Sequence, residues 1–69
     1  FEEADEELLL AVMALPVKLR ETVLLYFYQD MCVKEIAESL GLSSSAVSVR
    51  LDRAKKKLRI ALERRPYHG

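Results

Sequence analysis

Apolar residues recur three and four positions apart along four stretches of this chain, which is the spacing of amphipathic helices. The stretches predict helices over about 3–14, 16–28, 33–40 and 44–64. Pro16 ends the first stretch and suits the first turn of the second helix, where a missing N–H costs nothing. Gly41 suits a left-handed helix end, and Ser43 suits the cap of the last helix. The pattern therefore predicts short helices joined by tight turns.

Each predicted helix carries an apolar stripe, and we expect the four stripes to meet in one core. The first two stripes comprise Leu8, Leu9, Val12, Met13 and Leu15, then Leu19, Val23, Leu24, Phe27 and Tyr28. The other two comprise Ile36, Ala37 and Leu40, then Val47, Leu51, Ala54, Leu58 and Leu62. With 69 residues and no internal linker, the chain is long enough for one domain, 1–69. The expected fold class is all-α, a four-helix domain.

Residues 33–47 have the pattern of a helix-turn-helix. Two helices that cross steeply need a small residue where they approach, which is Ala37, and a turn residue that tolerates positive φ, which is Gly41. Apolar anchors lie on both sides of the turn, at Ile36, Leu40, Leu42 and Val47. Such an arrangement, winged-helix-like but without a wing, lets the second helix enter a DNA major groove. The alternative is a helical hairpin with no role in DNA binding.

Opposite its apolar stripe, the 44–64 helix presents small residues first and basic residues further along. This outward face comprises Ser45, Val49, Asp52, Arg53 and Lys56, flanked by Ser44, Ser48 and Lys55. Small side chains allow close approach to base edges, and lysines and arginines suit phosphates. We therefore expect phosphate contacts from Ser44, Lys55, Lys56 and Lys57. The alternative is an ordinary solvated helix face.

Individual roles on this face stay open at the level of the sequence. Arg53 suits guanine O6 and N7, the commonest specific contact, but suits a phosphate as well. Val49 is positioned for a thymine methyl group or is simply an exposed aliphatic residue. Asp52 either accepts from cytosine N4 or only orients Arg53 or Lys56. Ser45 and the neighbouring Ser48 both donate and accept, so they do not define a base.

The charge is distributed unevenly along the chain. The formal net charge is zero, which by itself argues against a nucleic-acid partner. However, residues 1–38 hold nine acidic and three basic side chains, whereas residues 39–69 hold two acidic and eight basic ones. The two parts therefore carry −6 and +6. Such a dipolar molecule presents its basic end to a polyanion.

The chemistry-bearing residues give little support to an enzyme. The one cysteine, Cys32, has no disulfide partner or metal-ligand spacing around it, which fits a cytosolic protein. The one histidine, His68, lies in the tail, and the serines of 43–45 have no His or Lys partner in a recognisable arrangement. We expect no enzyme activity, no cofactor, no metal and no insertion into a membrane. Because the chain begins at Phe1 without a methionine, we expect a fragment of a longer protein.

The chain resembles region 4 of bacterial sigma factors, and looks most like the extracytoplasmic-function group. The resemblance covers about residues 8–62 and is carried by Leu15-Pro16, Leu19-Arg20, Glu35-Ile36-Ala37, Val47, Arg50-Leu51, Arg53-Ala54 and Leu58. It implies binding to the −35 promoter element in the major groove, docking on the β flap of RNA polymerase, and occlusion by an anti-sigma factor in the bacterial cytoplasm. Carried over position by position, the base-reading residues are Ser45, Ser48, Val49, Asp52 and Arg53. Backbone contacts then include Lys34 and Lys56.

Two alternatives and one departure accompany the resemblance. The DNA-binding domain of a LuxR-type response regulator also carries a Lys-Glu-Ile-Ala run, although the Leu-Pro opening and the 53–58 segment favour a sigma factor. A pure protein-interaction module is the other alternative, through the acidic first half and the exposed Ile60. The departure is Cys32, where the family usually has Ser or Thr. Because cysteine is a poor cap, we expect a looser start to the helix that follows.

Overall fold

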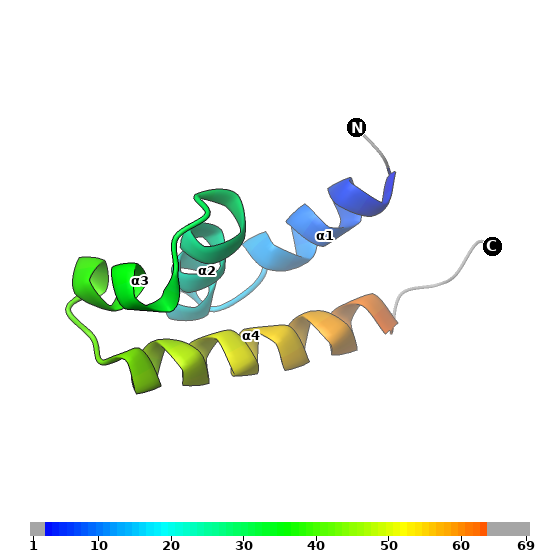
Figure 1. Ribbon diagram of the computed structural model, residues 1–69. Helices are drawn as coiled ribbons and strands as arrows, with labels where there is room; N and C mark the ends of the chain where they lie inside the picture. Colours follow the sequence, from blue (N-terminus) through cyan, green and yellow to red (C-terminus); the bar gives the residue numbers. More distant parts are fainter. Residues whose placement is uncertain (1–2, 64–69) are drawn as a thin grey trace.

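The computed structural model describes residues 3–63, and its fold is all-α and four-helical, as expected. The elements are α1 (Glu3–Met13), α2 (Val17–Val23), the π-helical turn η1 (Leu24–Tyr28), α3 (Val33–Leu40) and α4 (Ser44–Glu63). Figure 1 shows α4 along one side of the molecule, with α3, α2 and α1 arranged against it. The predicted end of the last helix at residue 64 and the histidine His68 lie outside the described residues.

Pro16 separates α1 from α2 but lies just before the second helix, not within its first turn. Its φ and ψ of −53° and 146° are non-helical, and its carbonyl accepts from the Leu19 and Arg20 N–H groups at 3.0 and 2.9 Å. The Arg20 guanidinium in turn donates to the Met13 carbonyl at 3.0 Å. This bond satisfies a carbonyl that the end of α1 leaves free. The connection between α1 and α2 is therefore fixed by hydrogen bonds to the carbonyls of both Met13 and Pro16.

The predicted 16–28 helix changes from α to π geometry after Val23. The Gln29 N–H donates to the Leu24 carbonyl at 3.2 Å, which is the five-residue spacing of a π turn. The wider turn shifts the angular position of every residue that follows. Phe27 and Tyr28, predicted to face the core, are consequently about half exposed, at 51 % and 50 %. That prediction was wrong because it assumed a constant period of 3.6 residues.

The turn between α3 and α4 matches the sequence prediction. Gly41 adopts a left-handed conformation, with φ 69° and ψ 35°, and the Leu42 N–H donates to the Ala37 carbonyl at 2.8 Å. Ser43 caps α4, since its Oγ accepts from the Ala46 N–H at 3.1 Å. Ala37, the small residue at the crossing, is buried. The helix-turn-helix geometry therefore rests on local signals that lie close together in sequence.

One core joins α1, α2, α3 and α4. Its buried apolar residues are Val12, Leu15, Leu19, Val23, Ile36, Ala37, Val47, Leu51, Ala54 and Leu58. Besides Phe27 and Tyr28, three predicted core residues are exposed instead: Leu8 at 38 %, Met13 at 49 % and Leu62 at 37 %. Leu62 follows Leu58, the last residue of α4 within this core, whereas Leu8 and Met13 face away from it. None of the described helices is both long and apolar enough to cross a membrane.

Candidate nucleic-acid interface

The burial of one side of α4 determines which side is free. Val47, Leu51 and Ala54 lie in the core, at 0 %, 6 % and 0 % exposed, so the positions on the opposite side of the helix point outward. All ten predicted contact residues are exposed: Lys34 on α3, and Ser44, Ser45, Ser48, Val49, Asp52, Arg53, Lys55, Lys56 and Lys57 on α4. We call the α4 residues Ser45, Ser48, Val49, Asp52, Arg53 and Lys56 the outer face of α4. This face is therefore accessible to a large partner such as double-stranded DNA.

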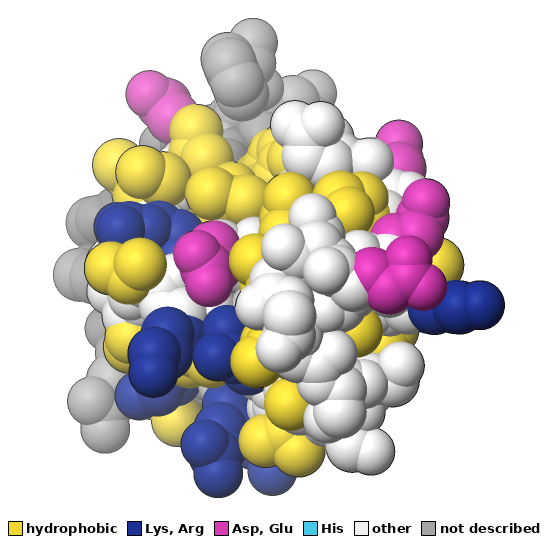
Figure 2. Space-filling model, turned by 90° about the vertical axis from the view of Figure 1, so that its left-hand side faces the viewer, with side chains coloured by type: hydrophobic (Ala, Val, Ile, Leu, Met, Phe, Trp, Pro, Cys, Tyr) yellow, Lys and Arg dark blue, Asp and Glu magenta, His cyan; other side chains and the backbone are white. Residues whose placement is uncertain are grey.

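Basic side chains gather on one part of the surface. Figure 2 shows the end of the molecule that lies at the left of Figure 1. Dark-blue lysine and arginine side chains gather at its lower left, whereas most acidic side chains lie to the right and at the top. In Figure 1 the lower side is that of α4, which carries Arg53, Lys55, Lys56 and Lys57. On this face of the described residues most basic side chains therefore lie apart from most acidic ones, although one acidic side chain lies among the basic ones and one basic side chain lies beside the acidic ones.

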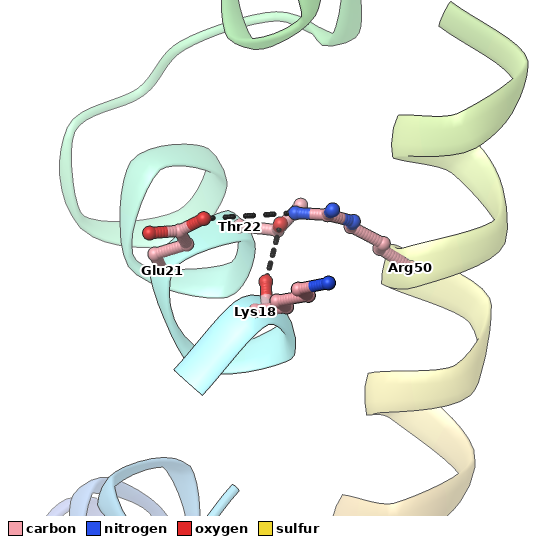
Figure 3. Close-up of polar contacts among 4 residues, drawn as sticks. All are labelled: Lys18, Glu21, Thr22 and Arg50. Carbon is pink, nitrogen blue, oxygen red and sulfur yellow. Dashed lines mark hydrogen bonds and ion pairs between the residues drawn. The ribbon is translucent and has the colours of Figure 1, made fainter. Parts of the chain in front are cut away.

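An ion pair joins α4 to α2 beside the outer face. The Arg50 guanidinium lies 3.6 Å from the Glu21 carboxylate, and the Arg50 side chain is only 20 % exposed. Figure 3 shows Arg50 reaching from α4 across to α2, where the buried Thr22 hydroxyl donates to the Lys18 carbonyl at 2.8 Å. Arg50 therefore faces the protein and not the solvent side used by Arg53. Sequence reasoning missed this pairing, because the two partners are far apart in the chain.

A second ion pair lies within the outer face itself. Asp52 Oδ2 is 3.2 Å from Lys56 Nζ, one helical turn further on. Both side chains are mostly exposed, at 64 % and 71 %. The sequence left open whether Asp52 contacts a base or orients a neighbour. In the free protein its partner is Lys56.

A carboxylate caps the N-terminus of α3. The Cys32 N–H donates to Glu35 Oε1 at 2.9 Å, which is half of a capping box. This bond to the Cys32 backbone, with a smaller contribution from its side chain, lowers the pKa of Glu35 below the ordinary value of 4.5. The looser helix start expected from Cys32 is therefore not observed, because Glu35 supplies the capping interaction. The predicted phosphate contact Lys34 lies in this capped turn.

An open hollow of about 600 Å³ lies where η1 leads into α3. It is lined by Tyr26, Phe27, Asp30, Met31, Cys32 and Val33. Tyr26 and Phe27 pack edge to face, with ring centroids 4.9 Å apart. The sequence pattern does not predict this hollow, because the hollow includes the end of the π turn and the left-handed Asp30, at φ 53°. Among the described residues, no cluster of His, Cys, Asp and Glu is arranged to hold a metal ion.

The geometry defines a helix-turn-helix protein of the DNA-binding class, with a capped second helix, an exposed outer face and a basic surface beside it. Comparison with known families matches residues 5–58 to sigma-70, region 4. The chain therefore belongs to the sigma-70 region 4 family, whose members are DNA-binding domains of sigma factors and not enzymes. The match favours the sigma-factor resemblance over the response-regulator alternative. No curated protein and no solved structure matches the chain.

Proposed function

We propose that this domain recognises the −35 promoter element for a sigma factor of the extracytoplasmic-function group. The observation that carries the proposal is the exposed outer face of α4, directly after a helix-turn-helix turn formed by Gly41 and Ser43. A helix held in this way enters the major groove with its N-terminal residues nearest the bases. The family match and the residues of the resemblance support the same assignment.

Within this proposal the contacts divide into two kinds. Ser45, Ser48, Val49, Asp52 and Arg53 face base edges, whereas Lys34, Ser44, Lys55, Lys56 and Lys57 contact phosphates. The small serines at the start of α4 leave room for the helix to approach the groove floor. The lysines further along contribute affinity that depends on salt and not on sequence.

The proposed protein partners are the β flap of RNA polymerase and an anti-sigma factor, in the bacterial cytoplasm. Surface remote from the outer face is available for them, since apolar side chains are exposed on α1 and η1. These include Leu10 at 68 %, Met13 at 49 % and Phe27 at 51 %. We expect the bound partner to cover these side chains.

Selection from a random pool of double-stranded DNA tests the proposal. The expected result is a recovered set of duplexes with a shared motif, bound at least about tenfold more tightly than random duplex. The measurement is fluorescence anisotropy at low salt, because a single small module binds DNA weakly. Recovery of duplexes without a shared motif, or equal affinity for selected and random duplex, would contradict the proposed function.

A further inference from the structure

Asp52 is the one carboxylate in a run of basic residues. Between Ser44 and Leu62 no other acidic residue occurs, and basic side chains surround it at Arg50, Arg53, Lys55, Lys56, Lys57 and Arg59. It lies on the outer face of α4, the side proposed to meet a polyanion. A carboxylate at such a place opposes the approach of phosphates. Its presence therefore needs a physical explanation.

Stability of the fold does not supply that explanation. The pair of Asp52 and Lys56 is exposed, and an exposed pair one helical turn apart contributes little to the stability of the folded protein. Neither side chain contacts the core, which lies on the opposite side of α4 at Leu51, Ala54 and Leu58. The 3.2 Å contact does, however, partly neutralise the charge of Lys56. The main consequence of the contact is therefore for the affinity of the outer face for its ligand.

We propose that Asp52 is a specificity-determining residue that lowers the affinity of the domain for DNA in general by holding Lys56. The proposal rests on the proposed function, namely DNA binding through the outer face of α4. On duplex that offers no hydrogen-bond donor to the carboxylate, Lys56 stays shared between Asp52 and phosphate. On the preferred duplex, a base amino group such as cytosine N4 donates to Asp52, and Lys56 is released to a phosphate. Discrimination thus comes partly from weakening the wrong complexes.

The test compares wild type with Asp52→Asn on a random-sequence duplex and on the selected duplex, over a range of salt concentrations. Because Lys56 is freed, Asp52→Asn should bind random duplex about three- to tenfold more tightly, with a salt slope steeper by about one. Affinity for the selected duplex should stay equal or fall, so the ratio between the two duplexes decreases. Thermal unfolding of both proteins should give the same midpoint to within about 2 °C.

Two further variants separate the proposed mechanism from a general effect of charge. Glu63→Gln makes the same change in net charge at the far end of α4, and it should change the affinity for random duplex less than about twofold. In a Lys56→Gln background, Asp52→Asn should no longer steepen the salt slope. An equal steepening in that background, or no tightening by Asp52→Asn alone, overturns the inference. Failure of wild type to bind any duplex overturns the proposed function as well, so the two failures are distinguishable.

Discussion

Arg50 and Arg53 are three residues apart on α4, yet their surroundings give them different roles. Arg50 is one-fifth exposed and lies 3.6 Å from Glu21 on α2, so its charge is paired with a carboxylate of the same chain. Arg53 is exposed on the outer face. Since a planar guanidinium can donate two parallel bonds to guanine, Arg53 is the side chain best suited to read a base. Arg50 instead forms an ion pair that connects α4 to α2.

Arg53→Ala should therefore weaken binding to the selected duplex much more than binding to random duplex. The loss of one bidentate contact corresponds to about 1–3 kcal/mol of discrimination. The matched control is Arg59→Ala, which removes the same charge one to two turns further along and should reduce both affinities equally. Equal losses for Arg53→Ala on both duplexes, measured by anisotropy at one salt concentration, would reassign Arg53 to a phosphate.

Leu51 and Leu62 give a second residue-scale prediction. Leu51 is 6 % exposed and lies in the core. Leu62 is 37 % exposed and lies beyond Leu58, the last core residue of α4. Leu51→Ala should lower the free energy of unfolding by about 2–5 kcal/mol, because it removes buried methyl groups and leaves a cavity. Leu62→Ala should cost less than about 1 kcal/mol. Urea denaturation followed by circular dichroism measures both, and a similar cost for the two variants would contradict the packing of α4.

At the scale of elements, helix limits that depend on nearby residues could be predicted from the sequence. The α3 helix ends and the α4 helix begins where expected, because Gly41 and Ser43 act on backbone groups within a few residues. The π turn η1 could not be predicted in this way. Its aliphatic and aromatic residues suit an α-helix equally well, so their pattern does not distinguish the two geometries. The exposure of Phe27 and Tyr28 follows from the π geometry.

The start of α3 gives a prediction about pH. Glu35 has a lowered pKa, so its stabilising contribution is present above the ordinary value of 4.5 and is lost as pH falls through the lower folded-state pKa. Wild type should therefore lose its stability advantage over Glu35→Gln as the pH is lowered from 7 towards 3. Thermal unfolding midpoints across this range measure the difference, with Glu38→Gln on the same helix as control. A wild-type advantage that is independent of pH would contradict the capping role of the Glu35 carboxylate.

At the scale of the whole molecule, α4 joins the other helices and leaves one of its own sides free. The free side could be predicted, because Val47, Leu51 and Ala54 lie on the opposite side at helical spacing. The pairing of Arg50 with Glu21 and the hollow beside η1 could not, because both depend on how distant segments pack. The extent of the core could not be predicted from the sequence either. The apolar spacing of α4 continues to Leu62, whereas the last α4 residue in the core is Leu58. The proposed contacts of the outer face remain predictions.

Amide chemical-shift mapping tests whether the outer face of α4 binds DNA. The measurement is a series of NMR spectra of the 69-residue chain during titration with a duplex recovered by selection. We expect the largest shift changes within residues 44–56, with smaller changes at the start of α3 and almost none on α1. Largest changes on α1 or around the hollow beside η1, with residues 44–56 unaffected, would contradict this expectation.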